Sequence, residues 1–295
     1  MQILTVDNLK KNYGRITALN GISFSVPAGC VFGILGPNGS GKTTLLAIIM
    51  SVLKPTGGSY RLFDEAPTDD HRKKIGTLLE TPNFYHYLSA VQNLKISAAI
   101  KGRGHDDIDR VLEVVNLTKR KHSAFSTYSL GMKQRLAIGA ALLGNPDVLV
   151  FDEPTNGLDP VGIAEIRSLI KRLSQEGKTI IMASHLLDEV EKVCTHVAIL
   201  KQGDLKASGS VNEIFVHEDI IELAAADNNK LETVLKNLTG YKKLTKEDGH
   251  IQLHYERGHA KLEDINAFCF KGAVVLNHLQ MKKKSLESKF FELTN

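Results

Sequence analysis

Short apolar runs recur along the chain and predict a buried β-sheet. Residues 31–35, 148–151, 179–183 and 197–200 are almost uninterrupted apolar segments. A strand that is covered on both faces reads as a continuous apolar run, because neither face meets water. We therefore expect these four segments to be strands of a parallel sheet flanked by helices.

Other spacings predict an antiparallel sheet and a helical region. The first roughly 30 residues alternate between apolar and polar positions, as a half-exposed antiparallel sheet does, and residues 27–29 read as a turn. Residues 45–52, 90–99 and 106–115 carry the apolar side chains of helices. The two later helices indicate a helical subdomain inserted between strands of the parallel sheet.

The pattern after residue 215 predicts a small second domain. Its element order is β-α-β-β-α-β, which is that of a split βαβ fold of ferredoxin type. The expected strands are residues 220–225, 241–245, 250–255 and 273–280, and the expected helices are residues 229–238, 260–268 and 286–293. This domain contains no motif for chemistry, so dimer contact, regulation and simple stabilisation all stay open as its role.

Composition and charge indicate a globular protein of a reducing, cytoplasmic compartment. The 295 residues, 42% of them hydrophobic, suffice for one large and one small domain. Apolar stretches reach only about eight residues, far below the roughly 20 that cross a bilayer, and the N-terminus lacks a secretory pattern. Cys30, Cys194 and Cys269 lack metal-ligand spacing. The net charge of +4 is dispersed apart from the lysines at 282–284, which fit either a solvated face or an anionic membrane surface.

A glycine-rich segment predicts a phosphate-binding loop between the strand 31–35 and the helix 45–52. Glycines let the backbone N–H groups converge, and the N-terminus of the helix adds partial positive charge. Lys42 is expected to reach the β- and γ-phosphates of ATP, and the Thr43 hydroxyl to bind Mg²⁺. The alternative, a glycine-rich turn that binds nothing, does not account for the strand before and the helix after. The expected ATP-binding residues of this loop are Gly36, Pro37, Asn38, Gly39, Ser40, Gly41, Lys42, Thr43 and Thr44.

Two carboxylates follow the apolar run 148–151. Ligands bind at the C-terminal ends of parallel strands, so Asp152 is expected to hold Mg²⁺. Glu153 is expected to orient or deprotonate the attacking water. The alternative is that the pair only caps the next turn, before Pro154.

A third segment, YSLGMKQR at residues 128–135, narrows the class. Together with the phosphate loop and the acidic pair, it resembles the signature sequence of ATP-binding cassette (ABC) ATPases, placed just before a helix expected from about residue 133 to 143. Leu130 stands where the family has its first glycine, and Met132 stands where glutamine is usual. Ser129 and Gly131 match the family pattern.

The resemblance implies a dimer in which two ATP molecules are sandwiched between subunits. Ser129, Gly131 and Met132 of one subunit would cover the γ-phosphate held by the other in trans. The partner subunit would be a second copy of the chain or a paralogue. A separate transmembrane permease would hold the pair against the inner face of the cell membrane.

Three further residues match family positions. His185 resembles the switch histidine that contacts the γ-phosphate and steadies the catalytic Glu153, although it also fits the first turn of a helix capped by Ser184. Asp159 resembles the residue of the loop that couples the two active sites. Tyr13 resembles the aromatic residue that stacks on adenine, with an ordinary strand tyrosine as the alternative.

Glu80 departs from the family pattern. It occupies the position of a glutamine that touches Mg²⁺ and senses the membrane partner. A carboxylate is still an oxygen ligand, so the metal role survives, while its added charge is expected to alter the coupling of hydrolysis to motion. A glutamate here resembles ATPases of bacterial bacteriocin, lantibiotic and peptide-antibiotic export or immunity systems.

The sequence as a whole predicts an α/β protein with a P-loop NTPase domain of ABC type. This domain would span residues 1–215 and combine an antiparallel β subdomain, a parallel sheet core and a helical subdomain at about 86–145. Residues 216–295 would form a small α+β accessory domain of ferredoxin type. The expected function is ATP hydrolysis that powers export of a peptide antibiotic, bacteriocin or drug. The alternative is a soluble ABC ATPase acting on nucleic acid or the ribosome; no nucleic acid is expected as a partner, because such proteins carry two cassettes or long coiled-coil insertions.

Overall fold

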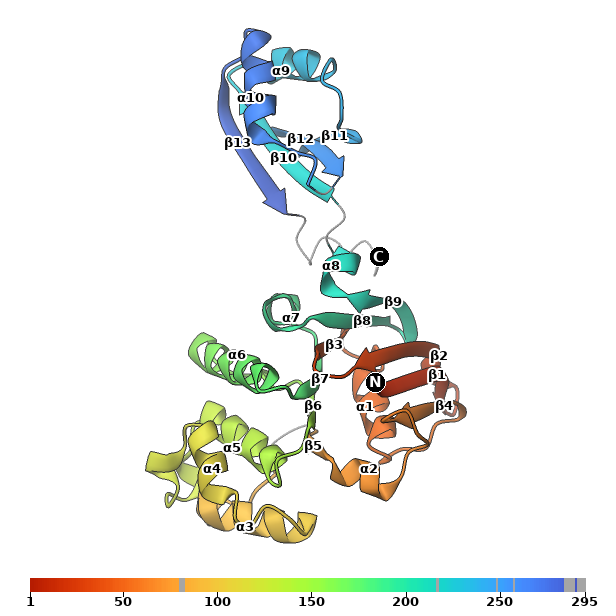
Figure 1. The fold of residues 1–295 in the computed structure, drawn as a ribbon, viewed down its shortest axis with the longest axis vertical. Coiled ribbons are helices and arrows are strands. Elements are labelled where there is room, and N and C mark those ends of the chain that lie inside the picture. The colour runs from red at the N-terminus through yellow and green to blue at the C-terminus, as the bar shows by residue number, and fades with distance from the viewer. Residues whose placement is uncertain (80–82, 216–217, 248, 257, 284–289, 291–295) are drawn as a thin grey trace. The chain divides into compact units, whose positions relative to one another are not determined.

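The chain divides into two compact units between Ser210 and Val211 (Figure 1). The structure is a computed structural model and describes residues 1–79, 83–215, 218–247, 249–256, 258–283 and 290. The sequence pattern placed the division after residue 215. Each unit has its own hydrophobic core, and each is described by itself below.

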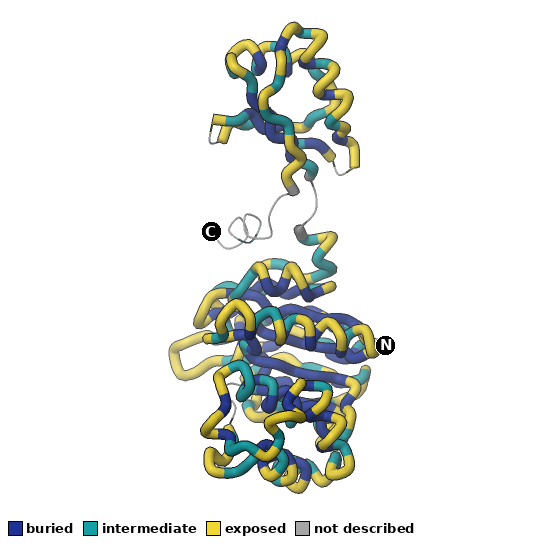
Figure 2. The backbone as a smooth tube through the Cα atoms, turned by 90° about the vertical axis from the view of Figure 1, so that its left-hand side faces the viewer, coloured by how far each residue is buried: buried dark blue, intermediate teal, exposed yellow. Residues whose placement is uncertain are grey.

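A six-stranded sheet with the order β5-β6-β7-β3-β8-β9 forms the centre of the first unit. Its neighbours pair in parallel except for β9, which runs antiparallel to β8. The strands are β3 (Val31–Leu35), β5 (Ile75–Leu78), β6 (Val148–Asp152), β7 (Thr179–Ser184), β8 (His196–Lys201) and β9 (Asp204–Ser210). Every residue of β3, β6 and β7 is buried, as their apolar sequences predict (Figure 2).

A second sheet of the first unit is antiparallel and has the order β2-β1-β4. Its strands are β1 (Gln2–Tyr13), β2 (Ile16–Pro27) and β4 (Gly57–Leu62). Helix α1 (Lys42–Ile49) shares one core with this sheet and with β3, β6, β7 and β8 (Figure 1). Leu45, Leu46, Ile48 and Ile49 of α1 have no exposed surface, so this core fixes the helix that follows the phosphate loop.

The remaining helices of the first unit flank the parallel sheet or extend from it. α3, α4 and α5 lie together as a helical group (Figure 1), and Gly139 of α5 packs closely against Val111 of α4. The bounds are α2 (Asp69–Lys73), α3 (Ala90–Lys101), α4 (Ile108–Val114), α5 (Leu130–Leu142), α6 (Pro160–Gln175) and α7 (Leu187–Val193).

The second unit has the strand order and the antiparallel pairing of a split βαβ fold, β11-β12-β10-β13. After α8 (Val211–Phe215) come β10 (Glu218–Ala225), α9 (Asn228–Leu235), β11 (Lys243–Glu247), β12 (His250–Glu256), α10 (Leu262–Lys271) and β13 (Leu276–Lys283). The expected final helix, residues 286–293, lies outside the described residues except for residue 290.

One local expectation and one alternative were wrong. α5 begins at Leu130 and not near residue 133, because the Ser129 hydroxyl accepts the Met132 N–H and caps the helix. His185 does not lie in the first turn of a helix capped by Ser184, because α7 begins at Leu187.

Candidate functional site

Three loops meet at one edge of the parallel sheet. The strands β6, β7 and β3 are neighbours, and their ends are level: Asp152 pairs with Ala183, and Leu35 pairs with Ser184. The residues that follow these ends are Gly36, Glu153 and His185. Parallel strands point their carboxyl ends the same way, so the topology alone brings the three loops together.

The phosphate loop wraps around the N-terminus of α1. Gly41 is the N-cap residue, with φ of 106°, and a Cβ atom there would lie 2.5 Å from the Ala18 carbonyl oxygen. A Cβ atom on Gly36 would lie 2.4 Å from both the Leu200 carbonyl oxygen and the Ser40 hydroxyl. Both positions therefore require glycine. No side chain caps α1, so its first N–H groups are available to an anion.

A cavity of about 220 Å³ opens at this helix terminus. It is lined by Ala18, Asn38, Gly39, Gly41, Lys42, Thr43, Thr44 and Glu153. The predicted phosphate-loop residues Gly36, Pro37 and Ser40 do not line it. Gly36 and Pro37 instead offer their carbonyl oxygens to Lys42 Nζ, at 2.8 and 3.2 Å.

Glu153 contacts both other predicted catalytic residues. Its Oε1 lies 3.5 Å from Lys42 Nζ, and its Oε2 lies 2.8 Å from His185 Nδ1. The Lys42 side chain is 6% exposed and that of Glu153 20%, while that of His185 is 34% exposed. The three side chains thus form a continuous polar chain from the loop interior to the solvent. Glu153 therefore lies at the same cavity as the first residues of α1.

The predicted magnesium ligands are oxygen donors around this cavity. The Thr43 hydroxyl belongs to the lining, and Asp152 ends β6 directly before Glu153, buried to 3% exposure. Within the described residues, no group of three His, Cys, Asp or Glu side chains could hold a metal ion. Mg²⁺ bound with a nucleotide commonly takes a few protein oxygens and completes its shell with phosphate and water, and the oxygens of Thr43 and Asp152 are of a type that suits it. Glu80 lies outside the described residues.

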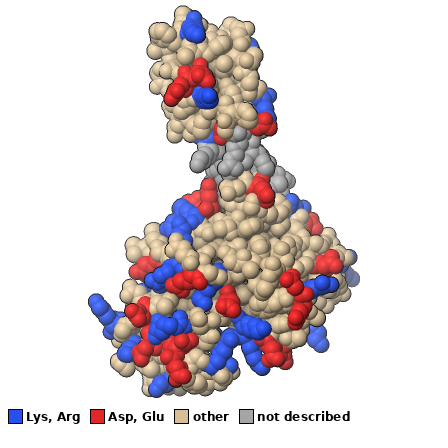
Figure 3. All heavy atoms as spheres, in the orientation of Figure 1, with Lys and Arg blue, Asp and Glu red and all other residues tan. Residues whose placement is uncertain are grey.

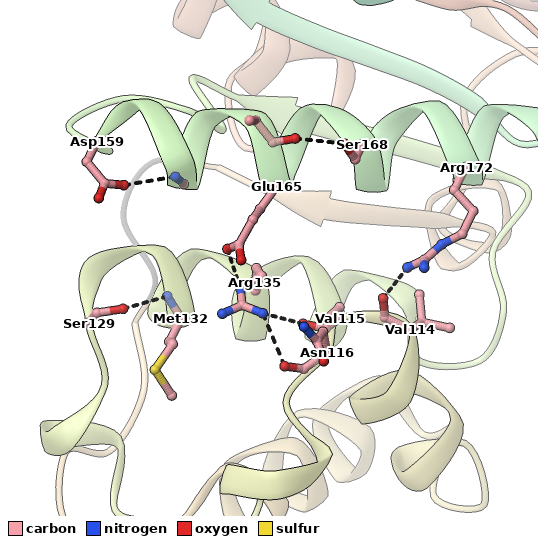
Figure 4. A network of polar contacts seen from close by, with 12 residues as sticks. Val114, Val115, Asn116, Ser129, Met132, Arg135, Asp159, Glu165, Ser168 and Arg172 are labelled. Carbon is pink, nitrogen blue, oxygen red and sulfur yellow. Dashed lines mark hydrogen bonds and ion pairs between the residues drawn. The ribbon is translucent and has the colours of Figure 1, made fainter.

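Ser129 and Asp159 occupy equivalent places at the starts of two helices (Figure 4). The Ser129 hydroxyl accepts the Met132 N–H at 3.3 Å, and Asp159 Oδ1 accepts the Gly162 N–H at 2.8 Å. None of Ser129, Gly131, Met132 and Asp159 lines the cavity at Lys42. Within one chain these four residues therefore do not contribute to the cavity at the phosphate loop.

Tyr13 ends β1 and does not line the cavity either. Its side chain is 45% exposed, and Lys11 Nζ lies 5.1 Å from the ring centroid. The Lys11 ammonium therefore lies over one face of the ring, and the residue remains partly open to solvent. On the face of the first unit drawn in Figure 3, Lys and Arg are interspersed with Asp and Glu, and no continuous basic stripe is visible there.

Sequence reasoning missed Ala18 of the cavity lining and two residues of α6, Glu165 and Arg172. Ala18 lies on β2, a strand that the alternation predicted, but no signal identifies one alanine of a strand as part of a phosphate site. Glu165 and Arg172 contact segments that are about 30 and 58 residues away in sequence, and charge patterning reveals pairs only within one helix.

Comparison with known proteins identifies the chain's relatives. Residues 19–156 match the sequence profile of the ABC transporter family. The bacitracin transport ATP-binding protein BcrA of Enterococcus faecalis is 35% identical over 99% of this chain and 96% of the relative. The lantibiotic transport ATP-binding protein SrtF of Streptococcus pyogenes is 36% identical, over 75% of this chain and 99% of the relative.

Among solved structures, the chain is similar to the ATP-binding cassette MJ0796, seen as a dimer in a post-hydrolysis state bound to ADP and Pi. The TM-score is 0.62 and the identity 27%, over 70% of this chain and 98% of that one. A protein of this fold therefore holds the products of ATP hydrolysis.

Proposed function

The chain belongs to the ABC transporter family as an ATP-binding subunit with ATPase activity, and we propose that it powers the export of a peptide antibiotic or drug through a separate membrane permease. The proposed mechanism of ATP hydrolysis is supported by the contact of Glu153 with both Lys42 and His185 at the phosphate-loop cavity. No observation favours the alternative of a soluble ATPase that acts on nucleic acid or the ribosome.

The proposed chemistry follows from the three side chains. ATP binds with its phosphates at the N–H groups of α1, and Lys42 exchanges its contacts with Gly36 and Pro37 for phosphate oxygens. Glu153 takes the proton of the attacking water or orients it, and His185 holds the Glu153 carboxylate in place. Tyr13 stacks on the adenine.

We propose that Thr43 and Asp152, with Glu80 as a further oxygen donor, would hold Mg²⁺ when the nucleotide is bound. The ion neutralises phosphate charge when it is bound. The oxygens of Thr43 and Asp152 suit this hard cation.

A composite site requires two subunits. We propose that Ser129, Gly131 and Met132 cover the γ-phosphate of a second subunit, with Asp159 beside them, because all four lie off the cavity of their own chain. The dimeric state of a similar cassette supports this arrangement. Either a second copy or a paralogue could supply the other half.

The permease is proposed to dock where the helical group meets the sheet. A cavity of about 350 Å³ lies between β5, α3 and α5, and Ile100 at its edge is 81% exposed. Tyr87, at 76% exposure, stands just before α3. Exposed apolar side chains beside a groove are typical of a protein contact. Every helix of the described residues is too short or too polar to span a bilayer. Docking on a permease would place the chain at the inner face of the cell membrane.

The substrate class rests on the relatives. A bacitracin and a lantibiotic transport protein are similar to this chain at 35% and 36% identity, and a linearmycin resistance ATP-binding protein of Bacillus subtilis at 33% over 99% of the chain. These compounds differ, so we propose a peptide antibiotic or drug as the class.

One experiment tests the proposal. The Glu153→Gln variant keeps the shape of the side chain but removes the base, so it should bind ATP, hydrolyse it at least about 100-fold more slowly and accumulate as a closed dimer. The tagged variant is trapped with ATP in the native cell, and solubilised membranes are searched for co-purifying proteins. A polytopic membrane protein is expected. Recovery only with ribosomes or nucleic acid, or normal turnover by the variant, would contradict the proposal.

A further inference from the structure

Helices α5 and α6 run side by side in the same direction, with their N-termini at the same end (Figure 4). α5 follows its cap Ser129, and α6 follows its cap Asp159. The helices approach closely here, since a Cβ atom on Gly131 of α5 would lie 4.0 Å from the Gly162 Cα of α6. Any contact that fixes α5 against α6 therefore fixes Ser129 against Asp159.

An ion pair joins the two helices at equal distance from both caps. Arg135 lies six positions after Ser129, and Glu165 lies six positions after Asp159. Six residues of helix correspond to about 9 Å in each case. Arg135 Nε lies 3.5 Å from Glu165 Oε2, and the Arg135 side chain is 14% exposed. Because a helix is stiff over two turns, a contact at this place links the relative height of the two caps to the packing of α5 on α6.

The same arginine also holds the end of α4. Its Nη1 donates to the carbonyl oxygens of Val115 and Asn116, at 3.2 and 3.1 Å. Arg172 of α6 donates from Nη2 to the carbonyl oxygen of Val114. A cavity of about 370 Å³ separates α6 from this part of α4 and α5, so the polar contacts at its rim take the place of close packing.

We propose that Arg135, Glu165 and Arg172 are positioning residues for the ATPase reaction, which hold Ser129 and Asp159 in register so that both meet the nucleotide of the partner subunit together. The three side chains are called the α6 clamp here. This inference rests on the proposed composite site. The clamp touches neither Lys42 nor Glu153. It therefore affects the residues that a chain presents to its partner subunit, Ser129 and Asp159, and leaves the phosphate loop of the same chain unchanged.

The test measures kcat and nucleotide affinity separately. Glu165→Gln removes the charge but keeps the size, and since the Glu165 side chain is 44% exposed, a loss of about two- to five-fold in kcat is expected. Binding of a fluorescent ATP analogue to the dilute chain should stay within two-fold of wild type. Glu176→Gln, at the exposed C-terminal end of the same helix, is the matched control and should leave kcat unchanged.

A double-mutant cycle tests whether Arg135 and Glu165 act through one contact, and the split between kcat and nucleotide binding separates positioning from a general loss of structure. Arg135→Lys and Glu165→Gln should each lower kcat, and the double variant should be no worse than Arg135→Lys alone, because the two changes break one contact. Glu165→Asp should restore part of the loss, and Arg172→Gln should lower kcat with unchanged nucleotide binding. Additive effects of the pair, equal loss of binding and kcat, or wild-type kcat in Glu165→Gln would overturn the clamp. If the wild-type protein does not hydrolyse ATP, the proposed function is overturned instead.

Discussion

The backbone of Glu153 adopts a left-handed conformation, with φ of 47°. A residue with a Cβ atom takes this conformation at an energetic cost, so the surrounding structure must hold it. The Glu153 N–H donates to the Ala183 carbonyl oxygen at 3.0 Å, and its own carbonyl oxygen accepts the Asn156 N–H at 3.1 Å. These two bonds hold the turn after β6 in the conformation from which the carboxylate contacts both Lys42 and His185.

Replacing His185 tests the role of this arrangement at the scale of one residue. His185→Gln removes the imidazole that lies 2.8 Å from Glu153 Oε2, so the carboxylate loses the partner that orients it. We expect kcat to fall by about 100-fold with nucleotide affinity unchanged. Steady-state ATPase rates and equilibrium binding of a fluorescent ATP analogue measure the two effects.

The control for this prediction is His105→Gln, since His105 is exposed and lies far along the chain between α3 and α4. It should behave as wild type. Equal kcat in both variants would remove His185 from the catalytic group.

The sequence was enough to predict the residues that lie together at the ends of the parallel strands. It was not enough to predict contacts between two helices that are far apart in the sequence. Lys42, Glu153 and His185 follow three apolar strands, and parallel strands necessarily bring their ends together. The pair of Arg135 and Glu165 has no such signal, because two helix surfaces become neighbours only through tertiary packing.

At the scale of elements, α5 is held at both ends by other segments. Its start is capped by Ser129, and its last carbonyl groups receive cations: Lys101 Nζ of α3 donates to the Ala140 oxygen at 2.6 Å, and Arg110 of α4 donates to the Leu142 oxygen at 3.5 Å. Cations at a helix C-terminus satisfy the unpaired carbonyls and the helix dipole. Contacts at the C-terminal end of α5, the helix that follows Ser129, therefore hold α3, α4 and α5 together.

Lys101 makes this end of α5 sensitive to pH. Burial lowers the pKa of Lys101 from 10.5 to about 8, so between these values the unfolded chain binds a proton that the folded chain has lost. The contribution of Lys101 to the free energy of unfolding therefore increases as the pH rises from about 8 to about 10.5. We expect Lys101→Met to lack this rise, in denaturant unfolding curves recorded at each pH.

Lys171→Met serves as the control because Lys171 is an exposed lysine of α6. Its stability should follow the wild-type dependence on pH. Parallel curves for wild type and Lys101→Met would show that Lys101 does not titrate in this window.

The pattern did not predict β4 or α6, for different reasons. β4 contains two glycines and three polar residues in six positions, and it is a strand because it pairs with β1. α6 begins directly after the loop that follows β6. Its start is fixed by the side chain of Asp159 and by Pro160 at its first position. For β4 the deciding contacts therefore come from another strand, whereas α6 carries the signal for its start in its own sequence.

At the scale of the whole molecule, the two units have separate hydrophobic cores. The cluster around α1 draws on strands of the first unit alone, and the cluster around α9 and α10 draws on the second unit alone. SrtF matches 75% of this chain with 99% of its own length, so a transport ATP-binding protein of this family can be about a quarter shorter than this chain.

A chain ending after residue 210 tests whether the first unit is a complete nucleotide-binding domain. It keeps every residue of the cavity and of the α6 clamp, as well as β9, which pairs with β8 at the edge of the sheet. We expect cooperative unfolding and binding of a fluorescent ATP analogue within about two-fold of the full chain, since neither core cluster contributes residues to the other. A truncated chain that does not fold or does not bind nucleotide would show that the second unit completes the domain. If binding persists while antibiotic resistance in cells is lost, the second unit acts in assembly or regulation; if resistance persists as well, it serves to stabilise the chain.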